Sequence, residues 1–241
     1  MENVNQQTIW EDLIADESLK SLLKTANNPF KFQAELKTII DSFCREKSKI
    51  LEVGCSTGIT SFILDDRFNK TLLDLNAAAI RLSMELFARF HKKATFVVGD
   101  MFKLPLPDES FDIVFNSGVV EHFEYQARVN ALKEYARVLK PDGLMLIAFP
   151  NHFSKPYRLT YKYLNARNRW PYPKEIALFD MKHELSDAGF RLIERRILDL
   201  QTPIDYLNHV KVIGSLLKVF YSVVDYEGYL TSVMALKCSE K

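Results

Sequence analysis

The stretch ILEVGCSTGIT, residues 50–60, joins an acid and two glycines to the start of a candidate helix. Glu52, Gly54 and Gly58 form the pattern E-x-G-x-x-x-G. Glycine has no Cβ, so the backbone of such a turn can lie close to a ligand. The helix start behind it offers unpaired N–H groups and the positive end of a dipole. The stretch therefore predicts a ligand-binding turn, with a simple tight connection between strand and helix as the alternative.

A dinucleotide is the first ligand to consider, because dinucleotide sites also use a glycine-rich turn before a helix. Their pattern, G-x-G-x-x-G, would require glycine where this chain has Ser56 and Ile59. Only Gly54 fits, so the pattern argues against a nicotinamide-type cofactor.

Two acids close the next two expected strands, Asp74 in TLLDLN and Asp100 in VVGDM. Ligands of open α/β sheets bind beyond the carboxyl ends of the strands, where an acid can accept hydrogen bonds from both hydroxyls of a ribose. Taken singly, Asp74 could be a helix cap and Asp100 a loop residue. Together with the glycine turn, the two acids predict a nucleoside site.

Alternating strands and helices connect these residues. Short apolar runs predict strands at 49–53, 71–74, 95–98, 111–115 and 144–149. Helical periodicity predicts helices at roughly 30–46, after Gly58, after a cap at Asn76, and around 129–139. Farther along we expect a helix at 174–188, a strand at 190–199, helical residues 204–222 and a strand at 229–237. The alternation predicts an α/β fold, doubly wound around a mostly parallel sheet.

In this order and at these strand ends, the motifs resemble those of the class I S-adenosylmethionine-dependent methyltransferases, particularly their small-molecule, type 11-like group. LPLPDESFDIVFNSGVVEHF and VLKPDGLMLIAFPN continue the resemblance, which covers residues 35–150. The resemblance implies a Rossmann-like fold of seven strands, with 229–237 antiparallel, and S-adenosylmethionine as the cofactor. The chain departs from the group at Ser56, where a third glycine is usual.

The same resemblance implies a role for the side chains along the sheet edge. Asp74 would bind the ribose and Asp100 the adenine amino group, while the ring would pack on the next two residues. Residues 116–118 would line the methionine moiety. The cofactor-binding residues that the resemblance implies are Glu52, Gly54, Cys55, Ser56, Gly58, Asp74, Leu75, Asp100, Met101, Phe102, Asn116, Ser117 and Gly118.

Transfer of an activated methyl group requires an aligned acceptor atom and exclusion of water, and a base only where the acceptor holds a proton. His122 is the candidate catalytic base, because it follows the fourth strand and an ordinary histidine pKa of about 6.5 suits proton removal. A histidine that only orders the loop is the alternative, and His152 after the fifth strand is a second candidate. VVEH also resembles part of a metal-assisted subgroup. Gly118 stands where that subgroup has a further acid, so no metal is predicted.

Composition argues against several classes of protein. The net charge is +1, so global electrostatics predict neither a nucleic acid nor a membrane as partner. The three cysteines show no CxxC spacing, which argues against a zinc site and favours a reducing cytoplasm. The first residues lack the pattern of a secretory signal, and the apolar residues 210–224 are too short for a transmembrane helix.

Residues 151–174 carry six cations, six aromatic residues and no acid. The segment follows the fifth strand and should rim the acceptor pocket. We expect an amphipathic lid, with aromatic side chains inward and cations in solvent. The alternatives are that Arg158, Arg167 or Arg169 binds an anionic acceptor, that the segment binds RNA, or that it meets a lipid-like acceptor at a membrane surface.

The sequence thus predicts a single methyltransferase domain over residues 1–241. Its expected parts are a helical N-terminal cap at 1–46, a cofactor-binding core at 47–150, the lid at 151–174 and the rest of the sheet at 175–241. The predicted function is in-line methyl transfer to an oxygen or nitrogen atom of a small molecule. An RNA or protein methyltransferase and a regulatory cofactor-binding protein without turnover are the alternatives, and the oligomeric state is left open.

Overall fold

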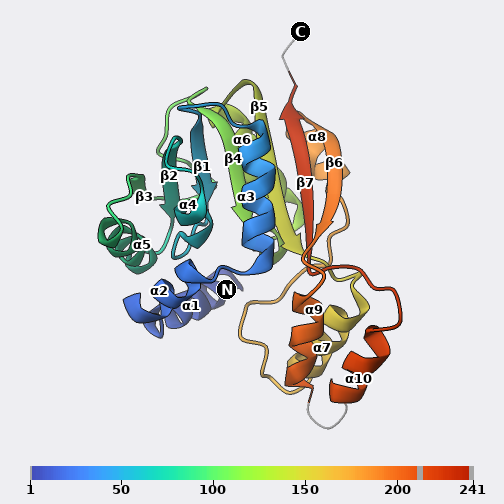
Figure 1. Ribbon diagram of the computed structural model, residues 1–241. Coiled ribbons are helices and arrows are strands. Elements are labelled where there is room, and N and C mark those ends of the chain that lie inside the picture. Colours follow the sequence, from blue (N-terminus) through green and yellow to red (C-terminus); the bar gives the residue numbers. More distant parts are fainter. Residues whose placement is uncertain (1, 211–213, 239–241) are drawn as a thin grey trace.

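The computed structural model describes residues 2–210 and 214–238, and a seven-stranded sheet forms its centre (Figure 1). The strand order is β3-β2-β1-β4-β5-β7-β6, and β7 runs antiparallel to both of its neighbours. This arrangement confirms the predicted doubly wound, mostly parallel sheet and its antiparallel last strand. The strands are β1 (Lys49–Val53), β2 (Asn69–Asp74), β3 (Thr95–Val98), β4 (Phe111–Ser117), β5 (Leu139–Pro150), β6 (Phe190–Leu198) and β7 (Leu230–Lys237).

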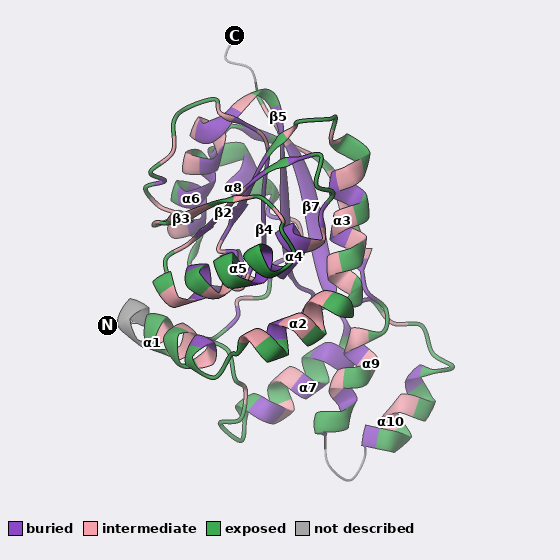
Figure 2. Cartoon of the chain, turned by 60° about the vertical axis from the view of Figure 1, so that its left-hand side comes forward, coloured by how far each residue is buried: buried purple, intermediate pink, exposed green. Residues whose placement is uncertain are grey.

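Helices cover both faces of the sheet. On one face lie α3 (Lys31–Phe43), α4 (Ile59–Ile63) and α5 (Ala77–Arg89), and on the other lie α6 (Tyr125–Val138) and α8 (Lys182–Asp187) (Figure 1). Ile50 of β1 packs in the cluster of α3, whereas its neighbour Leu51 packs in the cluster of α6. A strand buried on both faces needs apolar residues at successive positions, which explains the short apolar runs in the sequence. Figure 2 shows the sheet as the buried centre.

Local signals set the start of the helices next to the sheet. Oδ1 of Asn76 accepts hydrogen bonds from the N–H groups of Ala78 and Ala79, so α5 begins where the sequence predicts a cap. Gly58 precedes α4 with φ +71°, a left-handed conformation that favours glycine. The turn between β1 and α4 is therefore as tight as its two glycines indicate.

The N-terminal helices α1 (Glu2–Ala15) and α2 (Leu19–Asn27) are docked on the sheet domain. Leu22 of α2 is buried with the side chains of α4 and α5, and Ile14 of α1 is also buried. The oxygen Oγ of Ser18 caps α2 by accepting the N–H of Ser21. A few apolar residues in a polar segment are enough to attach it, because each buried side chain contributes about 1.5–3 kcal/mol.

Beyond the carboxyl end of β5, four short elements pack together, and we call them the helical unit (Figure 1). Tyr163 and Ile204 pack there against the buried Leu207 and Val210. The expected lid segment therefore packs with a later part of the chain, residues 202–210 and 214–221, which we expected next to the sheet. The elements are α7 (Lys155–Asn165), α9 (Thr202–Tyr206), the 3₁₀ turn η2 (Leu207–His209) and α10 (Gly214–Tyr221).

The predicted helix at 174–188 is wrong over its first half, since only Lys182–Asp187 is helical. The N–H of Ile176 donates to the carbonyl of Glu121, and the Glu175 carboxylate accepts the hydroxyl of Tyr157. These long-range hydrogen bonds hold the segment extended across the end of the sheet. A helical pattern in the sequence carries no information about such partners, because they lie far away along the chain.

None of the helices in the described part of the chain combines the length and apolar character that crossing a membrane requires.

Gly58→Ala should destabilise the protein more than Gly189→Ala. Both glycines have positive φ, but a Cβ at Gly58 would clash with Cδ2 of Leu72, whereas a Cβ at Gly189 would meet nothing within 4 Å. We expect a loss of about 1 kcal/mol for Gly189→Ala from backbone strain and about 2–3 kcal/mol for Gly58→Ala. Urea unfolding of both variants measures the difference, and equal losses would show that packing at the turn is unimportant.

Candidate functional site

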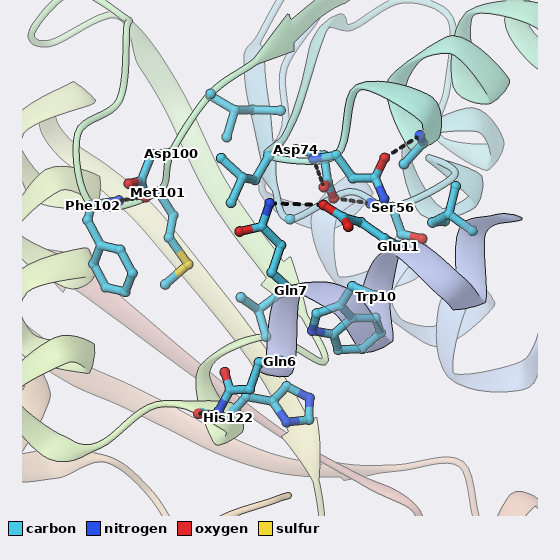
Figure 3. Close-up of a pocket in the computed structure, with 18 of the residues that line it drawn as sticks. Gln6, Gln7, Trp10, Glu11, Ser56, Asp74, Asp100, Met101, Phe102 and His122 are labelled. Carbon is cyan, nitrogen blue, oxygen red and sulfur yellow. Dashed lines mark hydrogen bonds between the residues drawn. The ribbon is translucent and has the colours of Figure 1, made fainter. Parts of the chain in front are cut away.

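A cavity of about 370 Å³ lies between the carboxyl ends of β1, β2 and β3 and helix α1 (Figure 3). We call it the first cavity. Seven of the residues implied by the sequence line it, and they come from three separate strand ends, as expected for an open α/β sheet. They are Gly54, Ser56, Asp74, Leu75, Asp100, Met101 and Phe102.

Asp74 connects the glycine turn to the start of α5. Its Oδ2 accepts the N–H of Ser56 at 2.7 Å, and its Oδ1 accepts the N–H of Asn76 at 2.8 Å (Figure 3). Burial raises the pKa of Asp74, and the backbone hydrogen bonds oppose this rise. Because a carboxylate oxygen has more than one acceptor site, both oxygens can still accept hydroxyl groups from a ligand.

Ser56 occupies the turn in a left-handed conformation, with φ +48°. This conformation explains why glycine would suit the position, and it also shows that serine does not prevent the turn from forming. The carbonyl of Ser56 accepts the Oγ hydroxyl of Ser83 from α5 at 3.1 Å. Ser56 is thus held from two elements, through its N–H by Asp74 at the end of β2 and through its carbonyl by Ser83 of α5.

Glu52 is buried beneath the turn, where its Oε2 accepts the N–H of Ser61 in α4 at 3.1 Å. Burial raises the pKa of Glu52 to about 8. A carboxyl group with this pKa is mostly protonated at neutral pH. The acid of the E-x-G-x-x-x-G pattern therefore holds the first turn of α4 in place.

Asp100, Met101 and Phe102 form the opposite wall of the first cavity. The Asp100 side chain is exposed, and its Oδ1 accepts the N–H of Phe102 at 2.9 Å. The Phe102 ring packs edge-on against Phe123, with 5.3 Å between centroids. A carboxylate thus stands beside a thioether and an aromatic ring, which together suit a flat ring that carries a hydrogen-bond donor.

A second cavity of about 280 Å³ adjoins the first, and both are lined by Trp10, Gly54, Ser56 and His122. Four further residues implied by the sequence line this second cavity: Glu52, Cys55, Ser117 and Gly118. The glycine turn therefore stands between the two cavities and contributes to both. Burial raises the pKa of Cys55, which keeps its thiol protonated and a poor nucleophile.

Two implied residues, Gly58 and Asn116, line neither cavity. Gly58 supplies the start of α4, as described above. Asn116 is fully buried, and its Nδ2 donates to the hydroxyl of Tyr135 in α6 at 3.0 Å. Successive side chains of a strand point to opposite faces, so Asn116 lies under α6.

His122 lies in the 3₁₀ turn η1 (Val120–His122) after β4, at the boundary of the two cavities. Its Nδ1 lies 3.1 Å from the carbonyl oxygen of Lys174. A carbonyl only accepts, so Nδ1 carries the hydrogen and Nε2 of the neutral ring is left as an acceptor. Burial lowers the pKa of His122, which favours this neutral form. The geometry therefore suits a proton acceptor.

The second candidate base, His152, lines neither cavity. Its Nε2 lies 2.9 Å from Oε2 of Glu175, and the same oxygen accepts the Tyr157 hydroxyl at 2.7 Å. Glu175 does line the second cavity. His152 therefore orients an acid of the cavity wall.

Sequence reasoning missed the contribution of α1. Gln6 donates from Nε2 to the carbonyl of His122 at 3.0 Å, and the Trp10 ring packs edge-on against the His122 ring at 5.4 Å (Figure 3). Gln7 and Glu11 line the first cavity and are hydrogen-bonded to each other. The only available signal was Trp10, a large aromatic residue in a polar segment.

The cations of the expected lid lie away from both cavities. Arg158, Arg167 and Arg169 are exposed and line neither of them, and the Arg167 guanidinium stacks on Tyr163 at 3.8 Å. In the same segment Tyr157 is fully buried. Within residues 2–210 and 214–238, no group of three or more His, Cys, Asp or Glu residues is arranged to hold a metal ion.

Comparisons with known proteins agree with this geometry. Residues 51–147 match the family described as "Methyltransferase domain". A probable S-adenosylmethionine-dependent methyltransferase from Mycolicibacterium smegmatis is 32% identical over 145 residues, which are 59% of this chain and 52% of the relative. A fatty-acid O-methyltransferase from the same organism is 32% identical over 162 residues, 65% of this chain and 48% of the relative.

The solved structure of an S-adenosylmethionine-dependent methyltransferase from Methanosarcina mazei has the same fold. Its TM-score is 0.62 at 22% identity, and the match covers 84% of this chain and 98% of that chain. The chain spans about half the length of the curated relatives it matches.

Because of Glu52, the free energy of unfolding should decrease as the pH rises. Burial raises the pKa of Glu52 from 4.5 to about 8, so the folded protein keeps a proton that the unfolded chain releases. This stabilisation is fully present below pH 4.5 and is lost as the pH rises through about 8. Relative to Glu52→Gln, the wild type should lose about 1.4 kcal/mol per pH unit across this window. Denaturant unfolding at several pH values tests this, and a constant difference would contradict it.

Proposed function

We propose that this chain, which belongs to the class I S-adenosylmethionine-dependent methyltransferase superfamily, transfers a methyl group to an oxygen or nitrogen atom of a small molecule. The observation that carries the proposal is the pair of adjoining cavities, with the glycine turn and His122 at their boundary. One cavity suits a nucleoside and the other an acceptor, so the reacting groups would meet beside His122.

The residues of the first cavity fit S-adenosylmethionine. Asp74 offers both oxygens to a ribose, and Asp100 offers a carboxylate to an adenine amino group. Met101 and Phe102 supply apolar contacts for the ring, and Ser117 and Gly118 stand on the side of the methionine moiety. When bound, this cofactor supplies a methyl group already activated on a sulfonium.

The protein's own contribution is to orient the acceptor, exclude water and accept a proton. Trp10 and Tyr172 close the second cavity from α1 and from the segment before α8. The Lys174 carbonyl fixes the tautomer of His122, so Nε2 can take the proton of a hydroxyl or an amine. Alignment contributes more than the base does, because holding the two reacting groups in the right geometry lowers the barrier by about 7–11 kcal/mol.

The surroundings of the second cavity support a small acceptor. The cavity of about 280 Å³ is bounded by α1, the glycine turn and the residues before β7. Within 151–174, Tyr157 is fully buried, and the exposed Arg158, Arg167 and Arg169 line neither cavity. An RNA methyltransferase is therefore less well supported than an enzyme for a small molecule, such as the fatty acid in the name of one relative.

S-adenosylmethionine and S-adenosylhomocysteine should each stabilise the protein, whereas NAD should not. At a hundredfold excess over Kd, a ligand bound only by the folded state adds about 2.7 kcal/mol to the free energy of unfolding. Thermal unfolding with each ligand measures this effect. Asp74→Ala should reduce the shift, because it removes the expected ribose contact. A shift with NAD and none with the other two ligands would refute the proposal.

His122→Asn should lower methyl transfer about 10²–10⁴-fold if His122 is the base. Asparagine keeps a donor for the Lys174 carbonyl but removes Nε2, so S-adenosylhomocysteine should still bind. His91→Asn is the control, because His91 is exposed after α5. The readout is transfer of labelled methyl groups into a metabolite extract. Because burial lowers the pKa of His122, wild-type activity should fall only below pH 6.5. If His122→Asn is as active as His91→Asn, His122 is not the base and has only a structural role.

A further inference from the structure

The second cavity has two chemically different sides. Cys55, Ser117 and Gly118 form the side next to the glycine turn. The other side is aromatic, and its rings come from four separate parts of the protein. They are Trp10 of α1, Phe30 and Phe32 at the start of α3, Tyr172 before α8 and Tyr229 before β7.

The aromatic side is supported by ring contacts. Trp10 and Tyr172 have centroids 6.0 Å apart, and Phe32 and Tyr229 have centroids 5.7 Å apart. Behind them, Tyr157 packs edge-on against Tyr229 at 5.2 Å. The faces of such rings attract cations, and the attraction is larger in a site from which water is excluded.

The ionisable side chains that line the second cavity are mostly acids. Glu52, Glu121 and Glu175 line it, and no lysine or arginine is among its lining residues in the described chain. Glu52 is engaged with the backbone of α4. Glu175 is held by Tyr157 and His152, so its carboxylate is fixed in the wall. An anionic acceptor would meet these acids without a compensating cation.

Glu121 has an unmet hydrogen-bonding requirement. The residue is 1% exposed, and Oε2 has no hydrogen-bond partner among the described residues. Its Oε1 lies 3.7 Å from Nε2 of His122. A buried polar atom without a partner costs free energy, so native proteins rarely contain one without a functional reason. A donor on the acceptor molecule would satisfy it.

We propose that the acceptor is an amine, whose nitrogen is bound by Glu121 against the aromatic side formed by Trp10, Tyr172 and Tyr229. The inference rests on the proposed function and selects nitrogen from its two acceptor atoms. Burial raises the pKa of Glu121, so the group can meet a neutral amine as an acid or an ammonium as a carboxylate, with the same net charge. An alcohol would gain the hydrogen bond but not the attraction of the rings, and a carboxylate would be repelled by the negative faces of the rings.

The test is calorimetric titration of the full chain, saturated with S-adenosylhomocysteine, with 2-phenylethylamine, 2-phenylethanol and phenylacetate. These probes share one ring and differ in the group presented to Glu121. We expect the amine to bind at least about tenfold more tightly than either of the others. Glu121→Gln should abolish this preference and leave the affinity for S-adenosylhomocysteine unchanged. The control is Glu124→Gln, the same change at an exposed residue after η1, which should keep the preference.

A second variant, Glu175→Gln, keeps the test decisive if Glu121→Gln does not fold, because it should also reduce amine affinity. The inference is overturned if the alcohol or the carboxylate binds as tightly as the amine, or if neither variant reduces the preference. It is likewise overturned if Glu121→Gln weakens only S-adenosylhomocysteine, since Glu121 would then belong to the cofactor. If the wild type does not bind S-adenosylhomocysteine, the proposed function itself is refuted.

Discussion

The two oxygens of Asp74 each accept a backbone N–H group, one from Ser56 in the glycine turn and one from Asn76 before α5. These hydrogen bonds join the loops that follow β1 and β2. Neither loop can move away without leaving part of the carboxylate unpaired, which costs about 1–3 kcal/mol. The first cavity depends on this connection, because it lies between the two loops and α1. A side chain at the position expected for ligand binding thus also holds the site together.

The glycine turn shows the same combination of structure and function. The turn comes directly after β1, and it lines both cavities. Gly54, Ser56 and Gly58 all have positive φ. Beneath it, Glu52 receives the N–H of Ser61 and so ties the start of α4 to β1. Burying this acid raises its pKa and makes the protein's stability depend on pH. A tight turn with few side chains needs such support, since it cannot be held by packing alone.

Parts of the chain that are distant in sequence complete the second cavity. Trp10 comes from α1, Tyr172 from the extended segment before α8 and Tyr229 from the residue before β7. Each of these segments lies outside residues 51–147, which match the methyltransferase family. In the proposed function, the matched region would supply the side for the cofactor, and the segments around it would select the acceptor. This division explains why the same superfamily can act on different molecules.

The sequence by itself determined the elements whose signals are local. β1 and β3 have the predicted bounds, and Asn76 caps α5, because buried strands and helix caps depend on neighbouring residues. The placement of Asp74 and Asp100 at one sheet edge follows from the same alternation of strands and helices. The mostly parallel sheet also followed from this alternation, whereas the antiparallel last strand was implied by the family resemblance.

Only the tertiary structure decided how distant side chains meet. Asn116 and Ser117 are adjacent, yet Asn116 bonds to Tyr135 under α6 while Ser117 lines the second cavity, because neighbours in a strand face opposite ways. Residues 174–181 are not helical, since Glu175 and Ile176 bond to partners many residues away. Trp10 reaches His122 across more than a hundred residues of sequence. Such contacts depend on the docking of whole elements, for which a local pattern carries no signal.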